Sequence, residues 1–130
     1  MDIEDKKLLI IDLCNRIPYD LKVSIKLPNY ENGTFDDCIG DLEGIDKYGV
    51  FLVNVDGIDY RTFKLDIKPY LRSLSSMTNA EKIIYRHLLE DGSYYELVDF
   101  CNERRLDYRG LIEKGLAIKV TKKNNPYKQV

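Results

Sequence analysis

The sequence predicts an α+β protein in which a helix and a small antiparallel sheet precede a helical part. Residues 21–65 alternate apolar and polar side chains with the period of two that is typical of strands. Residues 78–112 carry apolar side chains at helical spacing instead. The stretch Ile67–Thr78 separates the two patterns. We therefore divide the chain into residues 1–66, a packed junction over 67–78, and residues 79–130.

A first helix is predicted over Asp2–Asn15. Asp2 is placed to cap its amino end, and acidic residues in the first turn suit the positive end of the helix dipole. Pro18 ends the helix, because a proline disfavours helical geometry in the residue before it. The apolar face is expected to hold Ile3, Leu9, Ile10, Leu13, Cys14 and Ile17.

Four strands are predicted, over residues 21–27, 37–46, 50–55 and 58–65. Gly40 and Gly44 in the second strand indicate a bend or a close approach of another backbone. Asp56-Gly57 predicts a type I′ hairpin turn between the last two strands. We expect a strongly curved antiparallel sheet or a small barrel of the SH3-like or Sm-like kind. In the fourth strand the inward side chains are expected to be Ile58, Tyr60, Phe63 and Leu65.

The junction is expected to end the sheet and to start the helices. Pro69 lacks the N–H that a central strand needs, so Ile67–Pro69 is expected to leave the sheet. Thr78 and Glu81 form a capping box at the start of a helix that runs to about Glu90. Its inward face is predicted to hold Ile83, Ile84, His87 and Leu88.

Two further helices and a last strand are predicted after that helix. Ser93 and Glu96 form a second capping box, whose helix ends near Arg105. Asp107 is predicted to cap a shorter third helix, and Leu116–Val120 has the pattern of a short terminal strand. The inward side chains of the helix after Ser93 are expected to be Tyr94, Leu97, Val98 and Cys101.

No catalytic, metal or cofactor set is visible in the sequence. The one histidine, His87, is expected to be a core or boundary residue of its helix rather than a catalytic base. The three cysteines are widely spaced and without a C-x-x-C pair, so we expect reduced thiols and no zinc site. The turn at Asn54–Gly57 lacks the remaining ligands of a calcium loop.

The charges divide unevenly along the chain. Residues 1–66 hold 14 acidic and 8 basic side chains, and residues 67–130 hold 8 acidic and 12 basic side chains. Arg104, Arg105 and Arg109 stand near the ends of the predicted C-terminal helices. They are candidate phosphate contacts if those helices form a helix-turn-helix with the last strand as part of a wing. Alternatively, they complement a helix dipole, pair with the acidic first half, or bind an acidic protein partner.

Tyrosines offer a second kind of contact surface. The chain has 10 tyrosines and no tryptophan, and tyrosine is favoured at protein interfaces. Tyr94 and Tyr95 are adjacent in a predicted helix, so they point to different faces and at least one is expected to be exposed. Both are candidate partner contacts.

Three phrases resemble a known group of proteins: residues 67–78 (IKPYLRSLSSMT), 107–118 (DYRGLIEKGLAI) and 11–19 (IDLCNRIPY). They look like a group of small proteins, without an established activity, from the genomes of gut Bacteroidetes and their phages or prophages. The resemblance implies an intracellular, mobile-element-encoded protein. The tail differs from that group, because Lys119, Lys122 and Lys123 stand where relatives have an acidic end.

These observations favour a non-enzymatic module for protein interaction or assembly, which either self-associates or binds another protein. The alternative is a nucleic-acid-binding regulator that uses the C-terminal helices. No apolar run approaches the roughly 20 residues that span a bilayer. We therefore expect a cytoplasmic protein with no membrane partner and no cofactor.

Overall fold

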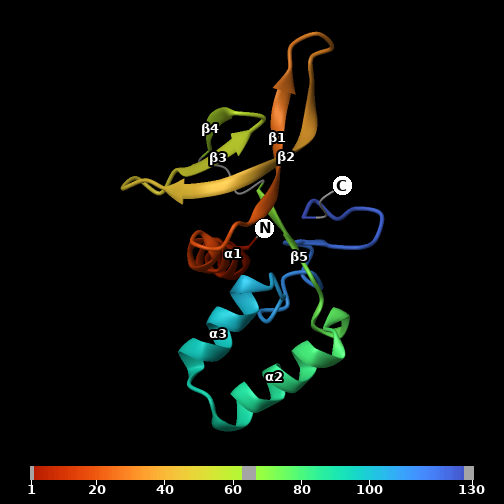
Figure 1. The fold of residues 1–130 in the computed structure, drawn as a ribbon. Coiled ribbons are helices and arrows are strands. Elements are labelled where there is room, and N and C mark those ends of the chain that lie inside the picture. The colour runs from red at the N-terminus through yellow and green to blue at the C-terminus, as the bar shows by residue number, and fades with distance from the viewer. Residues whose placement is uncertain (1, 63–66, 128–130) are drawn as a thin grey trace.

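A computed structural model describes residues 2–62 and 67–127 of the chain. The fold is α+β, with an N-terminal helix, a six-stranded mixed sheet and two later helices (Figure 1). None of the helices in these two ranges is long and apolar enough to cross a membrane. In chain order the elements are α1 (Ile3–Arg16), β1 (Lys22–Asn29), β2 (Thr34–Ile45), β3 (Phe51–Val55), β4 (Ile58–Thr62), β5 (Lys68–Leu71), a 3₁₀ turn η1 (Leu74–Ser76), α2 (Asn79–Asp91), α3 (Tyr94–Glu103) and β6 (Ile118–Lys119).

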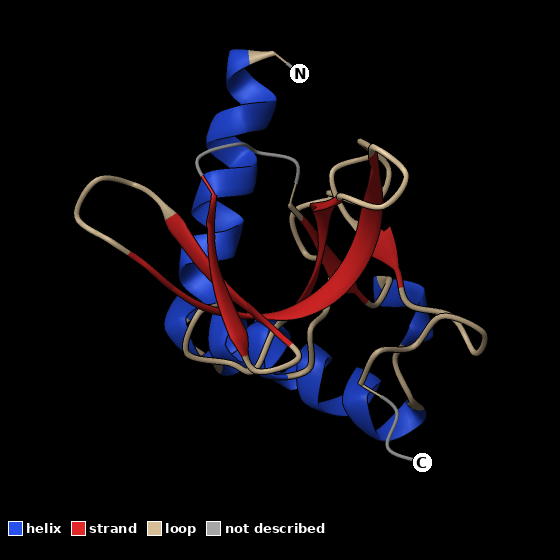
Figure 2. Cartoon of the chain, turned by 90° about the horizontal axis from the view of Figure 1, so that it is seen from above, coloured by secondary structure: helices blue, strands red, loops and turns tan. Residues whose placement is uncertain are grey.

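The strands form one curved sheet that is not closed into a barrel. The strand order is β4-β3-β2-β1-β5-β6, and all neighbours are antiparallel except β5 and β6. Figure 2 shows the sheet wrapping around one side of α1. Of the two expected forms, the curved sheet is therefore the observed one, and the SH3-like closure is wrong.

Close packing between β2 and β3 contributes to the curvature. Gly40 in β2 lies against β3, and a Cβ at this position would stand 2.6 Å from a methyl carbon of Val53. The pairing of β2 with β3 then shifts register between Leu42 and Gly44. The glycines thus mark the close approach and the irregularity that the sequence indicated. The Asp56-Gly57 turn is also as predicted, with both residues at positive φ.

The junction belongs to the sheet, contrary to the expectation drawn from Pro69. β5 pairs with β1 through Lys68 and Pro69, and with β6 through Tyr70 and Leu71. The ladder with β1 is only two residue pairs long, so a proline is tolerated there. Leu71 and Ile67 are fully buried.

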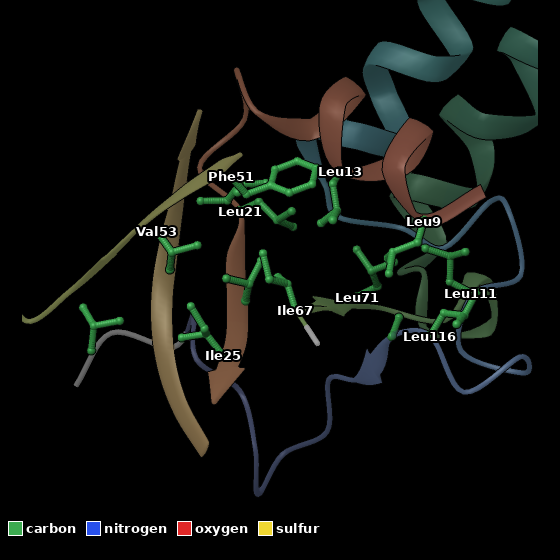
Figure 3. Close-up of a cluster of buried hydrophobic side chains, with 14 residues drawn as sticks. Leu9, Leu13, Leu21, Ile25, Phe51, Val53, Ile67, Leu71, Leu111 and Leu116 are labelled. Carbon is green, nitrogen blue, oxygen red and sulfur yellow. The ribbon is translucent and has the colours of Figure 1, made fainter. Parts of the chain in front are cut away.

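The main core lies between α1 and the inner face of the sheet (Figure 3). It draws on α1 through Leu9 and Leu13, on the junction through Ile67 and Leu71, and on the C-terminal segment. The residues it takes from that segment are Leu111, Leu116 and Ala117. The proposed division at 66 and 78 stays a prediction, although side chains from all three parts share this core. Within α1, Ile3 and Ile10 are exposed, so the buried stripe is centred on Leu9 and Leu13 instead.

The predicted third helix is absent from the C-terminal segment. Residues 107–115 form turns, and their place is fixed by Asp107, which accepts hydrogen bonds from the amides of Leu111 at 2.8 Å and Ile112 at 2.9 Å. The carboxylate therefore caps turns rather than a helix. β6 follows where a terminal strand was expected, but it joins the main sheet beside β5. Phe63 and Leu65, predicted to point inward from the fourth strand, lie outside the described residues.

Candidate interaction surface on the helical hairpin

Glu81 fixes the position of α2. Its carboxylate accepts two hydrogen bonds from the Arg72 guanidinium, at 3.0 and 2.6 Å, and one from the Thr78 amide at 2.9 Å. Arg104 at the end of α3 adds an ion pair at 3.4 Å. The hydrogen bonds from Arg72 hold the pKa of Glu81 at about 2, and Thr78 and Arg104 act in the same direction. The capping box predicted for α2 is thus also its anchor to the junction and to α3.

Apolar packing contributes less than these polar contacts to the attachment of α2, because no residue of this helix is buried. Its inner side contacts a small second core through Tyr85 and Leu88. The Tyr85 ring lies 6.5 Å from the ring of Phe100 in α3, measured between centroids. The buried members of this second core are Phe100, Cys101 and Leu106.

The apolar face that the sequence assigned to the interior of α2 points outward. Ile83 is 71% exposed, and Ile84 and His87 are exposed as well. With Ala80 these residues follow the i, i+3, i+4, i+7 spacing of one helix face, which we call the outer stripe. The prediction that Ile83, Ile84 and His87 face the core is therefore wrong. Leu88, which was predicted to face inward with them, does contact the second core, and Tyr85 joins it there. The exposed His87 ring lies 3.8 Å from the Asp91 carboxylate, one turn further along α2.

Tyr94 and Tyr95 stand at the end of the α2–α3 hairpin, where α3 begins. Their side chains are 70% and 81% exposed, and the two rings meet edge to face with centroids 6.4 Å apart. Tyr94 was expected to face inward and is exposed instead, because the second core takes Phe100 and Cys101 from the later turns of α3. Both tyrosines therefore lie at the surface next to the end of the helix that carries the outer stripe.

The three arginines predicted as candidate contacts are engaged within the chain. Arg104 pairs with Glu81 and lies over the Phe100 ring, 4.3 Å from its centroid. Arg105 donates two hydrogen bonds to the Asp20 carbonyl, at 3.2 and 3.1 Å, and lies over the Tyr127 ring.

Arg109 belongs to a buried ionic network that sequence reasoning missed. The Asp12 carboxylate accepts a hydrogen bond from Arg109 on one oxygen, at 2.8 Å, and one from Arg16 on the other, at 2.9 Å. Asp12 and Arg16 have 0% exposed side chains. Arg16 also donates to the Leu106 carbonyl at 2.7 Å, which joins α1 to the segment after α3. The i, i+4 spacing of Asp12 and Arg16 was visible in the sequence, but a surface pair has the same spacing.

The arrangement of these arginines differs from a helix-turn-helix. Only one helix, α3, is present where two were expected, and Arg105 and Arg109 bond to α1 and to the segment after it. Across the residues that the structure describes, no group of three or more histidine, cysteine or acidic side chains is placed to hold a metal ion. Of the predicted contact residues, Tyr94 and Tyr95 are therefore the ones that stay exposed, and the outer stripe is a second exposed region of the same hairpin.

Comparison with known proteins gives no relative. No protein-family model, no curated protein and no solved structure matches the chain.

Proposed function

We propose that the protein is a non-enzymatic assembly module that self-associates through the outer face of its α2–α3 hairpin. The observation that carries this proposal is the outer stripe, an apolar helix face that the chain itself leaves uncovered. A helix of this kind buries its apolar stripe against another element, and here the inner side of α2 already has its own contacts. Tyr94 and Tyr95, at the start of α3, add exposed aromatic area to the same hairpin.

The charges of α2 favour a second copy of the same helix as the occupant. Lys82 and Arg86 stand in its first and middle turns, and Glu90 and Asp91 stand in its last turn, with no basic residue there. Acidic groups at the carboxyl end oppose the helix dipole. In an antiparallel α2–α2 pair, the acidic end of each helix lies near the positive amino end and the basic side chains of the other. One self-complementary patch is sufficient for a two-fold dimer.

A charge placed on the outer stripe tests the proposal. We expect the wild-type protein to sediment as a dimer that dissociates on dilution, and Ile83→Glu to sediment as a monomer. Leu89→Glu is the matched control, because Leu89 is an exposed apolar residue of the same helix that lies off the stripe. A wild-type monomer at every concentration, or equal loss of the dimer in both variants, would overturn the proposal. Circular dichroism checks that all three proteins keep the same helix content.

The nucleic-acid alternative has less support. It requires Arg104, Arg105 and Arg109 to face phosphates, whereas their guanidinium groups already meet protein oxygens. We therefore base the proposed function on α2.

A further inference from the structure

A second surface lies at the opposite end of the molecule, where the β1–β2 hairpin projects beyond the rest of the sheet (Figure 1). α1 covers the inner face of the sheet only around the main core. Beyond it, the same face forms an open groove of about 540 Å³ between this hairpin and the β3–β4 turn. Its apolar and aromatic lining is Leu27, Pro28, Tyr30, Cys38, Val55, Ile58 and Tyr60.

One wall of the groove is an open strand edge. β2 pairs with β1 from Thr34 to Asp41, but with β3 only from Asp41 onward. In the described part of the chain no strand pairs with the other edge of residues 34–39. The amide of Leu42 donates to the Leu21 carbonyl, so even-numbered residues of β2 bond toward β1. The backbone groups of residues 35, 37 and 39 therefore face the open edge.

The rim of the groove is acidic. Glu31, Asp36 and Asp56 line it, and no lysine or arginine is among the described residues that do so. Asp36 accepts a hydrogen bond from the Asn29 side chain at 2.9 Å, which leaves its charge in place. Nearby Lys26 is paired with Asp37 at 3.0 Å. An occupant of this groove thus meets apolar side chains below and carboxylates around it.

We propose that this groove binds an extended basic segment of another protein, which adds to the open edge of β2 as an extra strand. Main-chain hydrogen bonds to residues 35, 37 and 39 supply the alignment, as in other cases of strand addition. Apolar side chains of the segment rest on the groove floor, and its lysines or arginines meet the carboxylates of the rim. The site is separate from α2, so binding does not require self-association.

A titration of the isotope-labelled full chain with a synthetic peptide of alternating lysine and valine tests this inference. We expect amide shifts concentrated in residues 34–39 and 55–60, and affinity that falls as salt rises because the contacts are ionic. A peptide with glutamate in place of lysine is the matched probe and should give no shift. Equal binding of both peptides, no shift with the basic one, or shifts located on α2 would overturn the proposal.

Two variants at one position separate strand addition from simple charge attraction. Asp37→Pro removes an amide that faces the open edge, whereas Asp37→Asn removes the same charge and keeps the amide. We expect the proline variant to bind about tenfold more weakly than the asparagine variant, the loss of about one to two hydrogen bonds. Equal affinities in two folded variants would contradict strand addition. If Asp37→Pro fails to fold, Asp56→Lys provides the test, since reversal of a rim charge should weaken binding and unchanged affinity would refute the site.

Discussion

Replacement of Glu81 by glutamine tests how α2 is held. Glutamine keeps the size of the side chain and can still accept the hydrogen bond from the Thr78 amide. It removes the charge that meets Arg72 and Arg104. Since α2 has no buried residue, we expect this single ionic anchor to contribute strongly to its attachment.

The size of the effect follows from the pKa of Glu81. A fall from 4.5 to about 2 corresponds to about 3 kcal/mol of stability, which is present while the carboxylate is ionised. The side chain is only 12% exposed, so solvent screens this interaction little. Because the folded-state pKa is the lower one, the contribution is complete above pH 4.5 and is lost as the pH falls toward 2. We therefore expect Glu81→Gln to cost about 2–3 kcal/mol at neutral pH and almost nothing near pH 2.

Urea denaturation of wild type and variant across this pH range measures the difference directly. Glu96→Gln is the matched control, because Glu96 occupies the same place in the capping box of α3. Its carboxylate accepts the Ser93 amide at 3.3 Å, and no arginine or lysine of the described residues pairs with it. We expect its cost to stay below about 1 kcal/mol. Equal costs for the two variants, or a cost for Glu81→Gln that does not change with pH, would refute the reasoning.

Two other substitutions test the sheet and the buried ions. Gly40→Ala should lower the free energy of unfolding by about 1–3 kcal/mol, because its methyl group would meet Val53 and the Asn54 carbonyl. Gly44→Ala is the control, with its nearest neighbour at 3.9 Å, and a similar loss there would show that close packing is not the cause. Asp12→Asn should cost about 3–5 kcal/mol in the same denaturation measurement, because it leaves two arginines facing a neutral side chain. A loss of unfolding free energy below about 1 kcal/mol would mean that the negative charge of Asp12 does not stabilise the folded protein.

Local signals in the sequence predicted the elements well. These signals depend on the side chain or backbone conformation of residues that are close together in the sequence. They are both capping boxes, the Asp2 cap, the Asp56-Gly57 turn and the two sheet glycines. Such signals can be read without knowledge of the tertiary structure. The α+β class was predicted from the change of apolar periodicity along the chain, and these local signals place its elements.

The errors arose where tertiary contacts decide the outcome. Ile83, Ile84 and His87 have the spacing of a core face. The contact of Glu81 with Arg72 orients α2 so that the neighbouring face packs against the rest of the chain instead. Asp107 has the form of a helix cap, yet its two hydrogen bonds close turns that place Leu111 in the main core. The candidate site was found in part: Tyr94 and Tyr95 were named from the sequence, whereas the outer stripe required the structure.

Sedimentation velocity of the full chain over a range of concentrations, with Ile83→Glu beside it, tests the central claim most directly. The account predicts that the wild type moves from monomer to dimer as concentration rises. It predicts that Ile83→Glu stays monomeric with unchanged helix content. A wild type that stays monomeric throughout, or an Ile83→Glu protein that dimerises as well as the wild type, would contradict it.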